Sequence, residues 1–390
     1  MKTKINIFLF EIILIVLLLI LGFYLSLISG YGSDEDTLPL IGAFESILGG
    51  DKLMASRFTP YPVAELGIGF LSYQFGSWAA NLITFIFIVI GLFFFYFGID
   101  KKSNNRTLLF FLLLSLTNPV IFFDNLEPID YSWAFLPLAI GLFFFKKKYF
   151  DLAIIFFGIS IGARIYFFLF VLAIILLFKN KNEISYNRKY IIFLGSFFIG
   201  GLFYLPFWFE NGMSLHWLTA ATPSDQGLFG LIARFSYKLI MSFSVLTALG
   251  LLMIFFILKK KNLKFNFPNF INGIIIVNLI IFFIIPAELS YLQPLIISVY
   301  FLCSINLSKK LIYILILLNL TSWFVEIKPL SVQYKSNDIC KNVEAIDAKI
   351  DFSLTKGRFY EYLNSRDKIK CWVKDESDRS KKILAGKALK

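Results

Sequence analysis

The apolar run INIFLFEIILIVLLLILGFYLSLI occupies residues 5–28 and holds one charged residue, Glu11. It is long enough to cross about 30 Å of hydrocarbon and too long for the core of a signal peptide. Lys2 and Lys4 precede it, which predicts a retained membrane helix with its amino terminus in the cytoplasm. The acidic cluster Gly32-Ser33-Asp34-Glu35-Asp36-Thr37 follows directly, so we expect it on the outer face.

Composition supports many such helices. The chain is 58% hydrophobic and only 16% charged, with a mean hydropathy of +0.73, and a soluble domain cannot bury that much apolar surface. The net charge of +12 comes from short basic runs between apolar segments, as is usual for the cytoplasmic ends of membrane helices. The sequence lacks the aromatic-interleaved basic patch of nucleic-acid-binding proteins, so we expect no nucleic-acid partner.

The sidedness of charge predicts an all-α polytopic protein with about eleven membrane segments. Basic clusters such as Lys146-Lys147-Lys148 fall inside when the acid-bearing loops fall outside, as the positive-inside rule requires. Residues 233–258 are expected to form one helix. Residues 149–178 carry basic residues at both ends, which predicts two short segments that meet near Gly162, with Arg164 at the break.

This topology divides the chain into two predicted domains. Residues 1–326 form the transmembrane domain, with a first outer loop over 30–77 that holds surface-lying helices and a turn. Residues 327–390 form a small polar domain, which helix parity places outside the cell. Cys340 and Cys371 lie in it; they are either an extracytoplasmic disulfide or two free thiols.

Two acidic loops and one buried cation are the candidate site. Carboxylates at a membrane surface can take a proton from a hydroxyl or hold a divalent cation. The first-loop acids are Asp34, Glu35 and Asp36; Asp124, Glu127 and Asp130 reach the same face in the second loop. Arg164 in hydrocarbon costs roughly 2.5–3.5 kcal/mol, so such a residue usually faces a wet cavity or an anion. The alternatives are acids that only mark the solvent boundary and an arginine that extends to the cytoplasmic surface.

This set suits attack by a hydroxyl on a phosphate-activated sugar. Phosphate leaves readily, so the transfer needs one base and a cation but no strong general acid, unlike glycoside hydrolysis. A single displacement of this kind inverts the anomeric centre.

Four motifs resemble, in order, the GT-C superfamily of integral-membrane glycosyltransferases, and most closely its bacterial branch related to protein O-mannosyltransferases and lipid A aminoarabinose transferases. The likeness covers about the first 180 residues, and Pro286-Ala287-Glu288-Leu289-Ser290-Tyr291-Leu292-Gln293-Pro294 is similar to a late loop of that fold. The four motifs are Ser33-Asp34-Glu35-Asp36-Thr37, Arg57-Phe58-Thr59-Pro60-Tyr61-Pro62-Val63-Ala64-Glu65-Leu66, Ile129-Asp130-Tyr131-Ser132-Trp133-Ala134 and Gly158-Ile159-Ser160-Ile161-Gly162-Ala163-Arg164.

The resemblance implies a polyprenyl-phosphate-linked sugar donor, a glycan, lipid or protein acceptor, and an active site on the outer side of the bacterial inner membrane. It implies that Asp34 is the catalytic base, with Asp36 as its rival. A third acid, Glu35, and a small basic tail in place of a large folded domain depart from the usual pattern. Metal dependence varies in the superfamily, so a divalent cation stays open.

The remaining roles follow from the same resemblance. Asp130, Glu127 and Asp124 are expected as supporting acids, and Arg164 or Arg57 is expected to meet the lipid phosphate. Glu288, Tyr291 and the only histidine, His216, are weaker candidates for substrate contact. Two other functions remain: a flippase or transporter of lipid-linked sugars, and a polymerase or ligase of surface polysaccharide.

Overall fold

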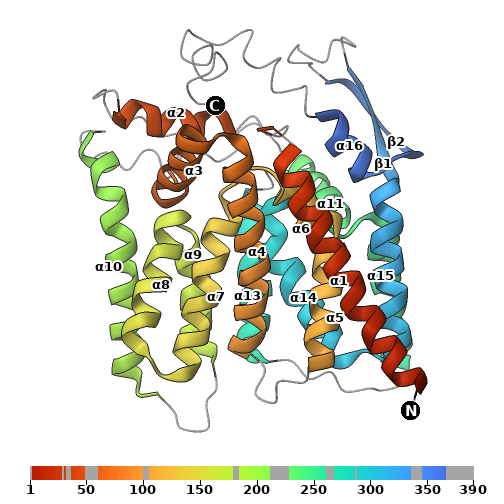
Figure 1. The fold of residues 1–390 in the computed structure, drawn as a ribbon, viewed down its shortest axis with the longest axis horizontal. Coiled ribbons are helices and arrows are strands. Elements are labelled where there is room, and N and C mark those ends of the chain that lie inside the picture. The colour runs from red at the N-terminus through yellow and green to blue at the C-terminus, as the bar shows by residue number, and fades with distance from the viewer. Residues whose placement is uncertain are drawn as a thin grey trace.

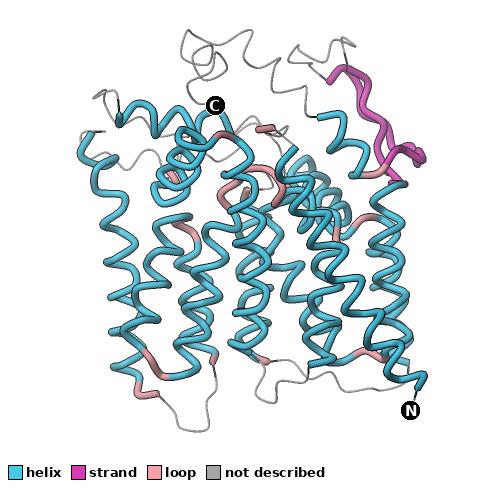
Figure 2. The backbone as a smooth tube through the Cα atoms, viewed as in Figure 1, coloured by secondary structure: helices cyan, strands magenta, loops and turns pink. Residues whose placement is uncertain are grey.

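The computed structural model describes residues 2–28, 30–31, 37–48, 60–99, 105–178, 184–210, 228–260, 268–285, 288–334 and 345–365. Helices dominate these residues (Figures 1 and 2). The elements up to the middle of the chain are α1 (Lys2–Ile28), α2 (Thr37–Leu48), α3 (Pro62–Phe75), α4 (Ser77–Ile99), α5 (Asn105–Thr117), α6 (Pro119–Asp124), α7 (Tyr131–Lys147), α8 (Phe150–Ala163), α9 (Phe167–Leu177) and α10 (Tyr186–Glu210). The remaining elements are α11 (Leu228–Phe243), α12 (Val245–Lys260), α13 (Asn269–Ile284), η2 (Leu289–Leu292), α14 (Gln293–Asn306), α15 (Lys309–Phe324), β1 (Val325–Tyr334), β2 (Ala345–Lys356) and α16 (Arg358–Ser365).

The long helices stand side by side (Figure 1). Helices α2 and α3 lie at one end of them, and α16 with the two strands lies at the same end on the opposite side. The chain begins at the other end, at the foot of α1. The first outer loop therefore contains two short helices, α2 and α3, as its amphipathic pattern predicted. Their position places the segments that flank the first acidic cluster at the same end as the C-terminal elements.

Length and apolar composition identify an integral membrane protein. Among the described residues, four helices could each cross a membrane: Phe8–Ile28, Ser77–Ile99, Tyr186–Glu210 and Leu289–Asn306. The pair α11 and α12 makes a fifth if it counts as one span, and several apolar helices are shorter. Large apolar side chains such as Phe198 are exposed on the outside of the bundle, as expected of a surface that faces lipid. The all-α polytopic class is confirmed, whereas the number eleven stays a prediction.

Two helix breaks show where hydropathy misleads. The prediction of one helix over 233–258 is wrong, because α11 and α12 meet at 89°. Ser244 lies between them with a φ of 63°, and its hydroxyl lies 2.6 Å from that of Ser322 on α15. The break between α5 and α6 falls at Asn118, whose Oδ1 accepts from the Ile121 N–H at 3.0 Å. Pro119 follows and cannot continue the hydrogen bonds of α5.

The predicted break near Gly162 is confirmed. Helix α8 ends at Ala163 and α9 begins at Phe167, which leaves Arg164 at the junction. Close packing of α8 against α10 fixes this position, because a Cβ on Gly158 would lie 2.6 Å from the Ile199 side chain.

The C-terminal segment contains regular structure that the sequence did not reveal. Strands β1 and β2 pair antiparallel, from Val325 opposite Lys356 to Tyr334 opposite Ala345. Helix α16 follows the second strand directly. Cys340 and Cys371 lie outside the described residues, so their disulfide stays a prediction, as does the boundary between the domains 1–326 and 327–390.

Candidate active site

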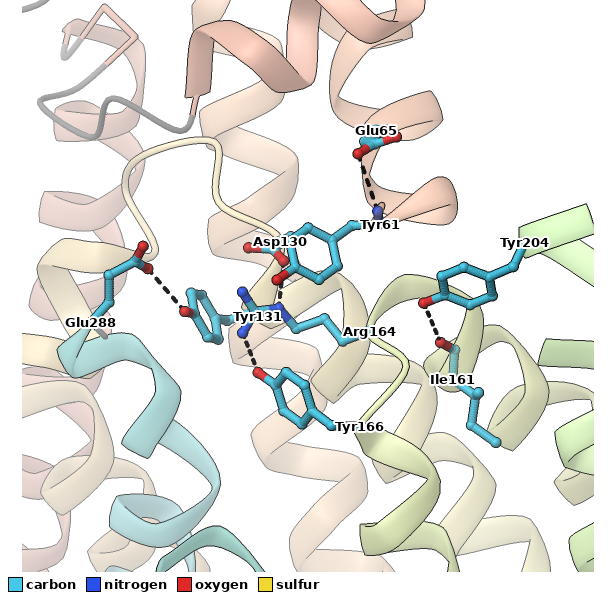
Figure 3. A network of polar contacts seen from close by, with 9 residues as sticks. All are labelled: Tyr61, Glu65, Asp130, Tyr131, Ile161, Arg164, Tyr166, Tyr204 and Glu288. Atoms are coloured by element: carbon cyan, nitrogen blue, oxygen red, sulfur yellow. Dashed lines mark hydrogen bonds and ion pairs between the residues drawn. The ribbon is translucent and has the colours of Figure 1, made fainter. Parts of the chain in front are cut away.

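The centre of the site is a buried ion pair between Arg164 and Asp130. Both side chains have no exposed surface. Arg164 follows α8 as its C-cap residue, and Asp130 directly precedes α7. The Arg164 Nε–H donates to the Asp130 carboxylate, and Nη1–H donates to the Tyr166 hydroxyl (Figure 3). Because a buried charge is costly without a partner, the pair explains how the interior holds this arginine.

Four tyrosine rings surround the guanidinium. Its central carbon lies 3.5 Å from the ring centroid of Tyr131 and 4.6 Å from that of Tyr291. The corresponding distances to Tyr61 and Tyr166 are 4.7 and 5.2 Å. The face of an aromatic ring attracts a cation, so the rings add to the stabilisation that Asp130 supplies.

These tyrosines come from segments far apart in the sequence. Tyr61 precedes α3, and its N–H donates to Glu65 Oε1 at 3.1 Å, which fixes the start of that helix. Tyr131 begins α7, and α7 is tied to α8 by a 2.8 Å hydrogen bond from the Ser160 hydroxyl to the Ala134 carbonyl. Tyr291 lies in η2, where the Asn278 amide donates to its carbonyl at 3.0 Å. The centre therefore forms only when the first loop, α7, the junction of α8 and α9, and η2 meet.

Three acidic residues near the ion pair form hydrogen bonds with neighbouring segments of the site. Glu288 Oε2 accepts from the Tyr131 hydroxyl at 2.9 Å (Figure 3). Asp124 Oδ2 accepts from the Ser290 hydroxyl at 2.6 Å. Glu127 is largely buried, and its N–H donates to the Asp124 carbonyl at 3.4 Å. Asp124 and Glu288 thus bond to η2 and to the residues around Arg164, and Glu127 is linked to the Asp124 backbone.

The ion pair leaves one donor and one acceptor open. Among the residues that the structure describes, Arg164 Nη2 and Asp130 Oδ1 are buried without a hydrogen-bond partner. Buried polar atoms are nearly always satisfied, by protein, water or ligand. The centre can therefore take a polar group that both accepts and donates.

The structure places six of the predicted site residues in one region: Asp124, Glu127, Asp130, Arg164, Glu288 and Tyr291. The other predicted residues, Asp34, Glu35, Asp36, Arg57 and His216, lie outside the described residues, so their roles stay predictions. Within the described ranges, no three His, Cys, Asp or Glu side chains form a group that could hold a metal ion.

Sequence reasoning named Tyr291 but missed the other three tyrosines that enclose Arg164. Tyr61 and Tyr131 stand inside motifs that drew attention for their charged residues, and Tyr166 is two residues beyond Arg164. Tyr131 beside Asp130 and Tyr166 close to Arg164 were the available signal, because ring faces stabilise buried cations.

Comparisons with known proteins agree with this architecture. No protein-family model and no curated protein sequence matches the chain. Among solved structures, ArnT from Cupriavidus metallidurans bound to undecaprenyl phosphate matches with a TM-score of 0.58 and 14% identity, covering 77% of this chain and 61% of that chain. The same protein in the apo state matches with a TM-score of 0.53 and 14% identity, covering 77% and 60%.

The chain shares the fold of ArnT. This agrees with the fold that the resemblance of the sequence motifs implies. The chain spans about three-fifths of the length of ArnT.

Proposed function

We propose that the chain is a membrane glycosyltransferase that takes a sugar from a polyprenyl-phosphate-linked donor. The acceptor is a glycan, a lipid or a protein, and the reaction takes place on the extracytoplasmic side of the bacterial inner membrane. The observation that carries the proposal is the buried Arg164–Asp130 pair beneath the first loop of an ArnT-like fold. Undecaprenyl phosphate is bound in one of the matching ArnT structures, which supports a donor of that class.

The first-loop acids supply the base in this proposal, with Asp34 as the first candidate, Asp36 as its rival and Glu35 beside them. Thr37 begins α2 directly after this cluster, and Leu40 of α2 shares a buried apolar cluster with Tyr61. Since Tyr61 covers Arg164, α2 packs beside the residues that enclose the ion pair.

The proposed reaction is a single displacement. The acceptor hydroxyl oxygen attacks the anomeric carbon while its proton passes to the first-loop carboxylate. The bond between the anomeric carbon and the phosphate oxygen breaks, and its electron pair stays on the phosphate. The new bond forms on the opposite face, so the configuration inverts. Arg164 or Arg57 steadies the charge that develops on the phosphate.

A flippase or transporter of lipid-linked sugars is the second candidate. Transporters often bind substrate at broken helices, and this chain has breaks between α8 and α9 and between α11 and α12. A polymerase or ligase of surface polysaccharide is a third candidate, and it differs from our proposal only in the acceptor.

Transfer from radiolabelled polyprenyl-phosphate sugars in membranes tests the proposal. We expect label in an acceptor with the wild type, and loss of transfer when the base is replaced in Asp34→Asn or Asp36→Asn. Thr321→Ala, on the exposed side of α15, is the control for expression. Full transfer by both aspartate variants would refute the catalytic role. Movement of labelled lipid across the bilayer without transfer would favour the flippase.

A further inference from the structure

The C-terminal helix α16 is docked on the outer end of the membrane helices. Phe359 and Tyr362 pack against Phe123 of α6, with ring centroids 6.1 and 5.6 Å apart. The Gly357 N–H donates to the Phe324 carbonyl at 2.9 Å. A Cβ on Gly357 would lie 2.6 Å from the backbone of Trp323, so glycine permits this close approach. The start of α16 is therefore fixed against the end of α15.

This docking brings Arg358 to the second acidic loop. Arg358 is the first residue of α16, and its Nη1 lies 3.9 Å from Asp124 Oδ1. Burial disfavours the charged form of Arg358, but the carboxylates of Asp124 and Glu326 outweigh burial and raise its pKa above the usual value. Burial also raises the pKa of Glu326, and Arg358 partly offsets that effect. Arg358 is thus a cation among carboxylates on the outer side.

Asp124 links Arg358 to the site. Its Oδ1 faces Arg358, while its Oδ2 accepts from the Ser290 hydroxyl at 2.6 Å. Ser290 lies in η2 between two residues of the centre. Glu288 accepts from the Tyr131 hydroxyl, and Tyr291 lies with its ring 4.6 Å from the Arg164 guanidinium carbon. Tyr291 also stacks on Tyr166, with ring centroids 5.7 Å apart and planes at 17°.

We propose that Arg358 is a positioning residue: it orients Asp124, which through Ser290 holds η2 with Tyr291 and Glu288 against the Arg164–Asp130 pair. The C-terminal segment then belongs to the same working unit as the membrane domain. When one oxygen of a carboxylate pairs with a cation that is held in place, the orientation of the whole carboxylate is fixed. Its other oxygen then accepts a hydrogen bond from a hydroxyl in one preferred position. The link is physical and contiguous, from α16 through α6 to η2.

Hydrogen–deuterium exchange of the full chain in detergent micelles tests the link without any assay of activity. In Arg358→Gln we expect the amides of residues 288–292 to exchange about five- to tenfold faster, because the ion pair that orients Asp124 is lost. Arg358→Lys keeps the charge and should restore most of the protection. Lys328→Gln is the matched control. Lys328 of β1 pairs with Glu361 of α16 at 2.6 Å and not with Asp124, so its replacement should leave amide exchange at residues 288–292 unchanged.

Ser290→Ala separates positioning from simple loss of the helix. If the amides of residues 357–365 also exchange faster in Arg358→Gln, α16 has left its position in that variant. The Ser290→Ala variant then tests the link, because it removes only the hydrogen bond between Asp124 and η2. Faster exchange at 288–292 with α16 still protected supports the proposal. Unchanged exchange at 288–292 in Ser290→Ala, or in an Arg358→Gln variant whose α16 stays protected, overturns it.

The kinetics of sugar transfer test whether Arg358 also affects the reaction, and this test rests on the proposed function. For a positioning residue, Arg358→Gln should lower kcat about tenfold or more with little change in KM, and Arg358→Lys should recover most of kcat. An unchanged kcat in Arg358→Gln would refute a role in the reaction. If the wild type shows no transfer at all, the proposed function fails, whereas the exchange experiment still decides whether Arg358 positions η2.

Discussion

At the scale of single residues, the chain holds an arginine in its apolar interior by surrounding it. Asp130 balances the charge, and Tyr61, Tyr131, Tyr166 and Tyr291 present their rings to the guanidinium. An ion pair in such a place gives little net stability relative to apolar residues, since both ions lose their water. Stability alone therefore gives no reason for an ion pair at this position.

Neutralising one partner of the pair should be far more costly than neutralising both. Asp130→Asn leaves Arg164 buried without a counterion, so we expect the free energy of unfolding to fall by about 3–5 kcal/mol. Asp130→Asn combined with Arg164→Gln should recover part of this loss. Denaturation in mixed micelles measures the stability of both variants, with Thr321→Ala on the exposed side of α15 as a control. An Asp130→Asn protein as stable as the wild type would contradict the buried pair.

At the scale of helices, the position of Arg164 depends on how closely α8 packs on α10. Gly158 and Gly200 let the two backbones approach, since a Cβ on either would lie 2.6 Å from an isoleucine side chain of the other helix. Helix α8 leads directly into Arg164. Small residues at a helix contact therefore help to set where the charged residue lies.

Gly158→Ala and Gly201→Ala form a matched test of this contact. The Gly158→Ala methyl would lie 3.1 Å from the Ser196 carbonyl oxygen and closer still to Ile199, so we expect a loss of about 1–3 kcal/mol of stability. Gly201 is on α10, where a Cβ would meet none of the described residues within 4 Å, so alanine there should be neutral or stabilise by up to about 1 kcal/mol. Thermal unfolding in detergent distinguishes the two variants; equal melting temperatures would contradict the close packing.

At the scale of the whole molecule, a buried polar network joins the two helix breaks to the last helices. Asn319 of α15 donates to the Leu114 carbonyl at 3.2 Å and to Thr117 Oγ1 at 3.3 Å. Its Oδ1 accepts from Thr247 of α12 at 2.9 Å and from Tyr300 of α14 at 3.0 Å. One amide thus connects α5, α12, α14 and α15 near the points where α5 and α11 end.

Removing this amide should destabilise the whole bundle. A hydrogen bond between membrane helices contributes about 0.6 kcal/mol on average, so we expect Asn319→Ala, which loses four, to cost about 2 kcal/mol. Thr321→Ala on the same helix removes only a bond to the Leu317 carbonyl of its own helix and should cost much less. Unfolding in detergent, monitored by circular dichroism, compares the stability of the two variants. A similar loss of stability in both would show that the Asn319 network contributes no more than a single hydrogen bond within one helix.

The sequence alone determined the membrane class, the break at Arg164 and the motifs that resemble GT-C enzymes, whereas the side of each acidic loop stays a prediction. These features follow from hydropathy, charge asymmetry and local spacing, which are properties of neighbouring residues. The bend at Ser244 escaped prediction because the partners of its polar side chains lie on α15, some seventy residues later.

Only the tertiary structure decided what surrounds Arg164 and where the C-terminal segment packs. Tyr61, Tyr131, Tyr166 and Tyr291 come from four separate segments, and Arg358 reaches Asp124 across more than half of the chain. No local pattern encodes these contacts, because ring stacking and ion pairing depend on how helices pack in three dimensions. The sequence could mark the charged residues one by one, whereas their pairing is a property of the folded bundle.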